Sequence, residues 1–447
     1  MSKLAFLFIL TFFCLIFASF MIAPYLSAIA YTMVYFINPE IRWWFTSIPS
    51  LPYSFIASFT MILVLVANHR TLGPQAPWRK QPIFKWILSI LACYFVMINF
   101  AVVPESHLRF TDYFLRTIAV VFLAYKLISS ERALHACLWA YILGATYISY
   151  IALSVGRNWQ GRVENIGMVD TGGDSNMTAA SLAPSLILLT YYAWLGNNKT
   201  KILALIFGGL IVNGLVLINS RGAFLGTAVG STYFLCYMIF SKYQRAGQRG
   251  IAIFVILTAI AGSLYVADDV FLERIGTLTE LEDGMKSGSH RIDYWFATFD
   301  MMEDYPIGVG IHGFTALSKN YLPAKYFEGR SIGRAVHSTW FQVISEIGWI
   351  GLFFFIALIL STFSISRKTK IYLLSKKNYT IYFKIIALEG SLITFLVAAT
   401  FIDRARAVTL YWLILYIAIA SNLYYLRFQH QLSTKSNSMD SRPKEDS

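Results

Sequence analysis

Residues 348–366 read GWIGLFFFIALILSTFSIS, an apolar run without a charged side chain. As a helix, a run of this length crosses a hydrocarbon core of about 30 Å. It directly follows a polar segment, residues 267–347, and so marks the point where chain outside a membrane enters it. Other apolar runs of this length indicate the fold class.

Further apolar runs of similar length are found along most of the chain. They lie near residues 52–68, 83–103, 112–128, 134–155, 178–194, 201–218, 222–240, 250–266, 384–401 and 408–426. Residues 3–37 add one long helix or two shorter ones, because Pro24 interrupts the run. The composition, 57% hydrophobic and 14% charged, is outside the range of soluble proteins. We predict an all-α polytopic membrane protein with 12–13 transmembrane helices.

The loops between these runs differ in their content of lysine and arginine. Short loops near residues 70–80, 199–201, 242–249 and 367–377 carry clusters of lysine or arginine, which predicts that they face the cytoplasm. Strict alternation then places residues 104–111, 156–177, 219–221, 267–347 and 402–407 outside. The side of the N-terminus stays open, because residues 3–37 cross either once or twice.

The order of apolar runs and polar segments divides the chain into four parts. Residues 1–266 form an N-terminal transmembrane bundle, residues 267–347 an outer loop with amphipathic helices, and residues 348–428 a C-terminal group of transmembrane helices. Residues 429–447 form a polar tail that we expect to be disordered and cytoplasmic. The net charge of +13 is spread among membrane-flanking loops, which argues against nucleic-acid binding. The four cysteines lie in apolar runs, which argues against a disulfide framework.

The outer segments are richer in arginine than in lysine. The planar guanidinium binds phosphate oxygens through paired hydrogen bonds, which suits a lipid-linked phosphate. Arg221 lies in Asn219-Ser220-Arg221-Gly222, a turn that barely separates two apolar runs. A charge at that boundary predicts a functional site. The alternative is an arginine that caps the preceding helix and extends toward the lipid headgroups.

Arg291 begins a predicted amphipathic helix. Ser289 is a candidate N-cap, and Ile292, Trp295, Phe296 and Phe299 recur at helical spacing before Pro306. We expect this helix to lie along the membrane surface. Its first-turn arginine would project near the positive end of the helix dipole, where an anion is favoured. Pairing of Arg291 with Asp293 or with acids upstream is the alternative.

Two further segments of the outer loop carry histidines. Pro306-Ile307-Gly308-Val309-Gly310-Ile311-His312-Gly313-Phe314 is too irregular for a nucleotide-binding loop, and we expect its glycines to let the backbone fold back toward the membrane. His337 precedes Ser338 and Thr339, candidate caps of a helix that continues to Gly348. A neutral histidine accepts a proton from a sugar hydroxyl at neutral pH. A structural role at the helix start is the alternative.

Four other outer residues are candidates for substrate binding: Asp174, Asn176, Arg162 and Arg404. Asp174 and Asn176 precede an apolar run, so they either hold sugar hydroxyls and arginines or cap that helix. Arg404 and Arg406 share a tight turn with Asp403 and either extend the anion site or pair with that carboxylate. The spacing of the outer acids fits no particular set of metal ligands.

In this order, the motifs resemble the O-antigen ligase and polymerase superfamily. They are Ser220-Arg221-Gly222, Arg291 followed by Trp295, the glycine-rich segment 306–314, and the histidine segment from His337 to Leu352. The nearest resemblance is to the O-glycosylation ligases found with exosortase systems, supported by residues 36–40 and 174–176. One departure is Ser338, where many members have asparagine.

The resemblance implies a GT-C-type glycosyltransferase of the bacterial inner membrane. It would transfer a glycan from an undecaprenyl-diphosphate carrier to a hydroxyl of lipid A-core, a protein or another glycan on the periplasmic side. His337 matches the catalytic histidine, and Arg221 and Arg291 match the arginines that bind the diphosphate. The reaction would invert the anomeric centre and need no metal or other cofactor. A polymerase of the same superfamily and a lipid-linked glycan flippase are alternatives, although no clear internal repeat favours a transporter.

Overall fold

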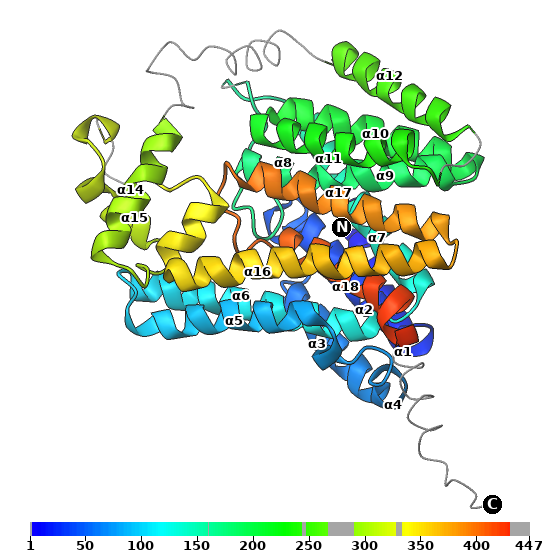
Figure 1. Ribbon diagram of the computed structural model, residues 1–447, viewed down its shortest axis with the longest axis horizontal. Coiled ribbons are helices and arrows are strands. Elements are labelled where there is room, and N and C mark those ends of the chain that lie inside the picture. Colours follow the sequence, from blue (N-terminus) through cyan, green and yellow to red (C-terminus); the bar gives the residue numbers. More distant parts are fainter. Residues whose placement is uncertain (1, 160, 244–246, 267–289, 328–332, 430–447) are drawn as a thin grey trace, which may run out of the picture.

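The computed structural model describes residues 2–159, 161–243, 247–266, 290–327 and 333–429, and these contain helices and no strands. The helices are α1 Lys3–Met21, α2 Leu26–Ile37, α3 Tyr53–Ala67, α4 His69–Leu72, α5 Pro82–Val96, α6 Pro104–Leu127, α7 Glu131–Val155, α8 Ser175–Leu182, α9 Pro184–Leu195, α10 Asn198–Ile218, α11 Arg221–Phe240, α12 Gln248–Val266, α14 His290–Asp304, α15 Gly313–Tyr321, α16 Thr339–Ser375, α17 Tyr379–Ala399 and α18 Val408–Ser421. The long helices run side by side, and α14 and α15 lie at one end of them (Figure 1).

The expected all-α polytopic fold is confirmed, with a different count of spans. In the described part of the chain, nine helices are long and apolar enough to cross a membrane. The run expected at 52–68 forms α3, which has only 15 residues. The run expected at 112–128 is the later part of α6, which begins at Pro104 and carries Glu105 and Arg109 before the run. The beginning of the expected outer loop, residues 267–289, and the tail from residue 430 lie outside the described residues.

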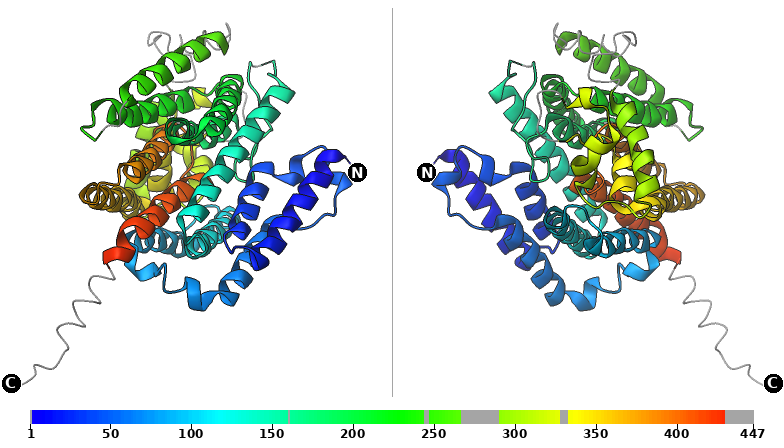
Figure 2. Two further views of the ribbon diagram at one scale, coloured as in Figure 1. Left: turned by 90° about the vertical axis from the view of Figure 1, so that its right-hand side faces the viewer. Right: turned by 90° about the vertical axis from the view of Figure 1, so that its left-hand side faces the viewer.

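Residues 3–37 form two helices, of which α1 is long and apolar enough to cross a membrane, whereas α2 has only 12 residues. The chain turns between α1 and α2 at residues 22–25, where Pro24 lies. Phe8 of α1 packs on Trp44 and Tyr53, with ring centroids 5.4 and 5.1 Å apart. The first half of α1 therefore lies beside the segment that follows α2, and the two helices form an antiparallel hairpin. Viewed along the long helices, this hairpin forms one flank of the molecule (Figure 2).

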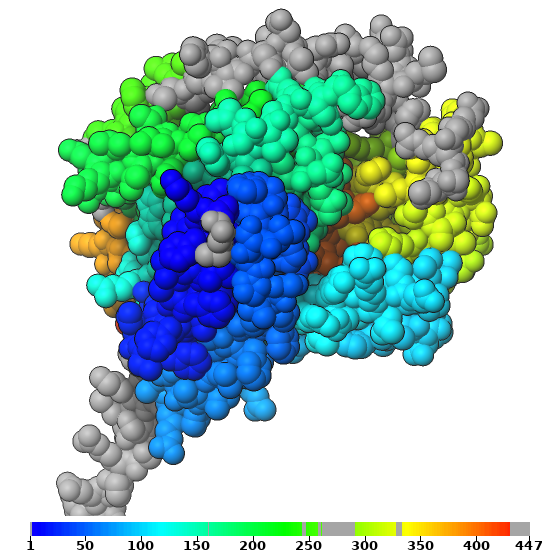
Figure 3. All heavy atoms as spheres, turned by 180° about the vertical axis from the view of Figure 1, so that it is seen from behind, coloured from blue at the N-terminus to red at the C-terminus, as the bar shows by residue number. Residues whose placement is uncertain are grey.

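The loops expected on one side of the membrane gather at one end of the bundle. Hydrogen bonds join Arg42 to Ile166, Val102 to Val309, Arg157 to Val216, Ser338 to Asp403, and Arg404 to Asp170. We call this the arginine end, made of residues 38–52, 97–104, 156–174, 219–221, 306–312, 333–338 and 400–407. From behind, its surface is hollowed between the teal, cyan and yellow segments (Figure 3).

The lysine-rich loops likewise meet at the other end. Contacts there join Lys126 to Gly73, Arg427 to Gln75, Tyr191 to Thr380, and the rings of Tyr243 and Tyr379. The two groups of loops therefore separate as the charge pattern predicts. The segment 38–52, and with it the Lys3 end of α1, belongs to the arginine end.

Helices α11 and α17 approach closely because glycines face the contact. A Cβ on Gly230 would lie 2.6 Å from the carbonyl oxygen of Gly390, and a Cβ on Gly226 would overlap the carbonyl oxygen of Thr394. Small residues spaced four apart let the backbones of membrane helices pack directly. This packing brings Arg221, at the first turn of α11, beside the last turn of α17.

Helix α16 is broken at Ile347 and Gly348, where the backbone leaves helical geometry. The break exposes two carbonyl groups, which accept hydrogen bonds from the glycine-rich segment: Val309 N–H to Ser345 at 2.7 Å and Gly310 N–H to Glu346 at 3.0 Å. A Cβ on Gly308 would lie 2.8 Å from the Glu346 carbonyl oxygen. The glycines thus serve close packing against α16.

Candidate functional site

A small hollow at the arginine end brings together residues that are far apart in the sequence. Its volume is about 80 Å³. The residues that line it are Arg162, Asn176, Ser220, Arg221, Gly222, Ala223, Arg291, Ala398, Phe401 and Ile402. We call it the arginine hollow. Arg221 and Arg291, predicted to act together, share it with two of the four further candidates, Arg162 and Asn176.

Three helices begin at the arginine hollow. Arg221 is the first residue of α11, Arg291 is the second residue of α14, and Asn176 is the second residue of α8. The first N–H groups of a helix lack partners within the helix and carry a partial positive charge. Guanidinium groups and helix starts therefore add their positive potentials in one place, which suits a phosphate or diphosphate.

Arg162 is held in place by neighbours on two other segments. Its Nη2 donates to Asn176 Oδ1 at 2.8 Å, and its Nε donates to the Ile218 carbonyl at 3.4 Å. Asp174 caps α8, because its carboxylate accepts the Met177 N–H at 2.8 Å. Desolvation by burial lowers the pKa of Arg162, and the nearby Asp174 carboxylate opposes that shift. Asp174 thus caps a helix and lies near the cations as well.

Arg291 has fewer partners than its charge calls for. Its Nε is buried and has no hydrogen-bond partner in the described part of the chain. Asp293, the partner considered from the sequence, accepts instead from the hydroxyl of Tyr326. Burial lowers the pKa of Arg291, Arg221 lowers it further, and Asp403 opposes both. A guanidinium stays charged in proteins, so the excess of positive charge around Arg291 favours a bound anion.

His337 does not line the arginine hollow, but it lies next to the helix that carries Arg291. Its ring centroid is 6.2 Å from that of Tyr294, one turn beyond Arg291 on α14. The residue as a whole is exposed, but desolvation by the surrounding protein lowers the pKa of its imidazole, and Arg291 lowers the pKa further. A lowered pKa keeps the ring neutral at pH 7, the state in which it accepts a proton.

The backbone at His337 adopts a conformation that is unusual for a residue other than glycine, with φ of 52°. Asp403 holds it there, because its carboxylate accepts the Ser338 N–H at 2.9 Å and also the His337 N–H. Strain of this kind persists where neighbours fix it, and it clusters at functional sites. Burial raises the pKa of Asp403 to about 7, although both N–H donors act to lower it.

The turn between α17 and α18 is bound to the start of α16. Thr339 Oγ1 donates to the Ile402 carbonyl at 2.8 Å and accepts the Arg404 N–H at 3.0 Å. The Trp340 indole donates to Thr400 Oγ1 at 3.0 Å. Since Ile402 also lines the arginine hollow, these contacts link the position of His337 to that of the arginines.

Arg404 has a different role from the one considered from the sequence. It does not line the arginine hollow. Its guanidinium donates to the carboxylate and the backbone carbonyl of Asp170, at 2.9 and 2.8 Å, and the expected pairing with Asp403 is not formed. Asp170 also accepts from the Tyr35 hydroxyl at 2.8 Å. Arg404 and Asp170 therefore fasten the 156–174 loop to the turn that carries Asp403.

Sequence reasoning did not identify Asp170 and Asp403 as parts of the site. Asp170 and Arg404 are 234 positions apart, so only the folded chain pairs them. Asp403 accepts hydrogen bonds from backbone N–H groups. Every residue except proline has such a group, so the residue types do not reveal the contact. His312 is exposed, as expected, and contacts Ser106 Oγ at 2.6 Å, away from the residues that line the hollow.

Comparison with known proteins gives one family. Residues 203–356 match the family model described as O-antigen ligase. The matched segment covers Arg221, Arg291 and His337, whereas Arg162, Asn176 and Asp403 lie outside it. No curated protein matches the chain.

Proposed function

We propose that this chain is a membrane enzyme of the O-antigen ligase and polymerase superfamily, whose family model matches residues 203–356, and that it catalyses one specific reaction. The chain transfers a glycan from an undecaprenyl-diphosphate carrier to an acceptor hydroxyl. The reaction takes place on the periplasmic side of the bacterial inner membrane, at the arginine end. The observation that supports this most strongly is the meeting of three arginines and three helix starts around one small hollow.

In this proposal, the diphosphate of the donor occupies the arginine hollow, with the lipid and the glycan extending from it. The acceptor oxygen forms a bond to the anomeric carbon while the bond from that carbon to the diphosphate oxygen breaks. The undecaprenyl diphosphate leaves with the electron pair, and Arg221 and Arg291 stabilise the charge that grows on it. Direct displacement inverts the anomeric centre.

His337 takes the proton of the acceptor hydroxyl. Its lowered pKa keeps it neutral at pH 7, ready to accept that proton. Asp403 is a positioning residue, because it holds the backbone of His337 and Ser338. Asn176 orients Arg162 through the contact at 2.8 Å, so a donor would meet a preorganised cation. Arginines can neutralise the diphosphate, so the reaction does not require a divalent metal.

A transfer assay tests the proposal. Purified protein in nanodiscs receives an undecaprenyl-diphosphate glycan and, in separate tubes, lipid A-core, a Ser/Thr peptide or a lipid-linked glycan as acceptor, with and without EDTA. Mass spectrometry detects the product. Transfer to one acceptor supports the proposal and separates ligase from polymerase activity, and loss of transfer with EDTA contradicts metal independence.

Arg221→Ala is the variant that tests the donor site. We expect transfer to fall by about 100-fold, the usual effect of removing a group that stabilises transition-state charge. Arg109→Ala is the matched control, because Arg109 is exposed on α6 and does not line the hollow. Unchanged transfer in a folded Arg221→Ala protein contradicts the assignment.

A further inference from the structure

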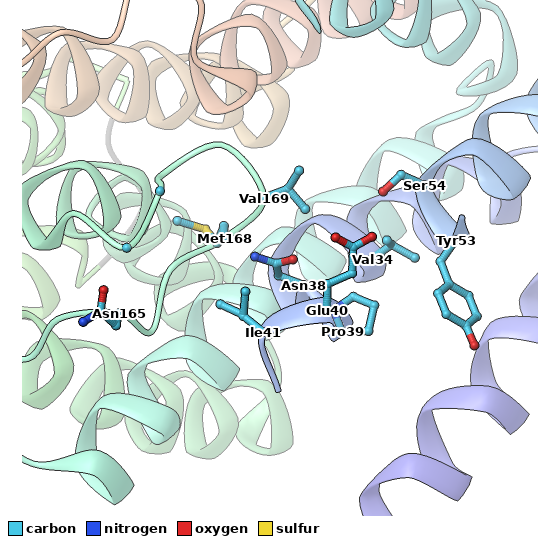
Figure 4. Close-up of a pocket in the computed structure, with 12 residues that line it drawn as sticks. Val34, Asn38, Pro39, Glu40, Ile41, Tyr53, Ser54, Asn165, Met168 and Val169 are labelled. Carbon is cyan, nitrogen blue, oxygen red and sulfur yellow. The ribbon is translucent and has the colours of Figure 1, made fainter. Parts of the chain in front are cut away.

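A second, larger cavity lies at the arginine end. Its volume is about 460 Å³, within the roughly 300–1,000 Å³ typical of small-molecule sites. One wall is formed by residues 38–41 and the start of α3, and the other by residues 165–173 of the loop before α8. Figure 4 shows the Glu40 carboxylate pointing into the space between Val169 and Ser54.

The two walls are bonded to each other, so the cavity is preformed. Arg42 is buried and donates from Nη2 to the Ile166 carbonyl at 3.3 Å. The Val169 N–H donates to the Tyr35 carbonyl at 3.3 Å. A site whose walls are already fixed loses little conformational entropy when a ligand binds.

The chemistry of this cavity is the reverse of that of the arginine hollow. Its polar groups include the Glu40 carboxylate, the Asn38 and Asn165 amides and the Ser54 hydroxyl, and none of the residues found to line it is cationic. A carboxylate disfavours a phosphate, whereas carboxylates and amides bind hydroxyl groups well. Val169 and other apolar side chains provide surface for the faces of a ring. The lining therefore fits an uncharged, hydroxyl-rich ligand.

The cavity lies close to the arginine hollow, because one loop contributes to both. Arg162 of the hollow is three residues before Asn165 of the cavity, and Gly173 of the cavity is three residues before Asn176 of the hollow. Three residues span at most about 11 Å. The nearest Cα atoms of the two linings are therefore at most about 11 Å apart along this loop.

We propose that this cavity is the acceptor site and that it binds a neutral sugar unit of a glycan acceptor. The inference rests on the proposed function, since it gives the second substrate of the transfer its own place. The donor diphosphate binds among the arginines, and the acceptor sugar binds between Glu40 and Val169. A Ser/Thr-containing protein segment is the competing occupant.

Saturation-transfer NMR tests binding without any donor. Protein in nanodiscs is mixed with equimolar cellobiose, lactose and N,N′-diacetylchitobiose or, separately, with a Ser/Thr peptide. Val169→Trp fills the cavity, and Glu40→Gln removes its charge while keeping its shape. The matched controls are Leu108→Trp and Glu105→Gln, which are exposed on α6 and line neither space. Thermal unfolding in detergent confirms that each variant is folded.

We expect at least one disaccharide to bind the wild type and both controls. Val169→Trp should abolish the signal, and Glu40→Gln should weaken affinity about tenfold, the effect of losing one charge-assisted hydrogen bond. Absence of sugar binding, or equal binding by a folded Val169→Trp, overturns the inference. Peptide binding that Val169→Trp removes overturns the glycan assignment.

The transfer assay separates this inference from the proposed function. Sugar binding that depends on the cavity, in a protein that transfers nothing, refutes the proposed function alone. Transfer with the same acceptor KM in wild type, Glu40→Gln and Val169→Trp refutes the acceptor site alone. With both correct, the two variants raise the acceptor KM about tenfold and leave the donor KM within about twofold.

Discussion

At the scale of single residues, the geometry of the guanidinium at Arg291 matters as much as its charge. Its Nε is buried without a partner in the described residues, so a bound phosphate oxygen would satisfy it. We expect Arg291→Ala to lower kcat/KM by about 100-fold and Arg291→Lys by about tenfold, because lysine keeps the charge and loses the fork. Steady-state kinetics with a varied donor measures both. Equal activity of wild type and Arg291→Lys would show that charge alone suffices.

A pH profile tests the role of His337. Burial, and then Arg291, lower its pKa below the ordinary value of 6.5. Because the neutral ring is the active form, kcat/KM should fall as the pH decreases through that lowered pKa, with a midpoint below 6.5. Asp403, with a pKa raised to about 7, is the competing source of an acid limb. Asp403→Asn should keep the midpoint below 6.5, and a limb near 7 that this variant removes would assign the limb to Asp403.

The residues that carry the candidate site could be partly predicted from the sequence. Arg221 stood out because a charge beside an apolar run needs a reason, and Arg291 because it lies in the first turn of a predicted amphipathic helix, where an anion is favoured. Arg404 had the same appearance, but its charge is satisfied by Asp170, and no local pattern distinguishes a paired arginine from one that faces a cavity. The position of His337 depends on a carboxylate 65 or more residues away that holds backbone N–H groups.

At the scale of elements, the contact of α11 with α17 sets where Arg221 lies. Gly→Ala usually stabilises a helix by about 1 kcal/mol. We expect Gly230→Ala to destabilise instead, because the new Cβ would meet Thr394 and Gly390. Gly208→Ala in α10 is the control, since nothing lies within 4 Å of its Cβ. Unfolding temperature in detergent should fall for the first variant and stay equal or rise for the second.

Helix existence was predicted better than helix length. The start of α16 before a break at Gly348 and the end of α14 before Pro306 follow from glycine, proline and apolar spacing. The apolar run at 52–68 matches α3 to within one residue at each end, but this helix of 15 residues is shorter than the 18 residues of a candidate span. Helix α6 begins before the apolar run, so its charged first turns are helical too. Helix formation and partition into a membrane are separate properties, and an apolar run therefore does not mark the ends of a helix.

At the scale of the molecule, the two ends of the bundle give a prediction about sidedness. Ser2 and Ser47 lie at the arginine end, and Ser375 lies at the lysine-rich end. In a background with Cys14, Cys93, Cys137 and Cys236 replaced by serine, Ser2→Cys and Ser47→Cys should react with a membrane-impermeant maleimide added to spheroplasts. Ser375→Cys should react only after lysis. The opposite pattern would reverse the orientation.

The arrangement of loops at two ends followed from lysine and arginine counts, since those charges record which loops stay inside. The hairpin of α1 and α2 did not, because Pro24 permits either a kink or a reversal. Aromatic contacts of Phe8 with Trp44 and Tyr53 decide for reversal. These contacts depend on how the side chains pack in three dimensions, which a single sequence does not reveal.

The short second helix of that hairpin bears on how the chain enters the bilayer during synthesis. With 12 residues, α2 rises about 18 Å, well short of a hydrocarbon core of about 30 Å. Alone, it would leave its flanking peptide groups without water or partners in lipid. Helices α1, α3 and α7 pack against it, so during synthesis α2 gains its full set of partners only after α7 has entered the membrane.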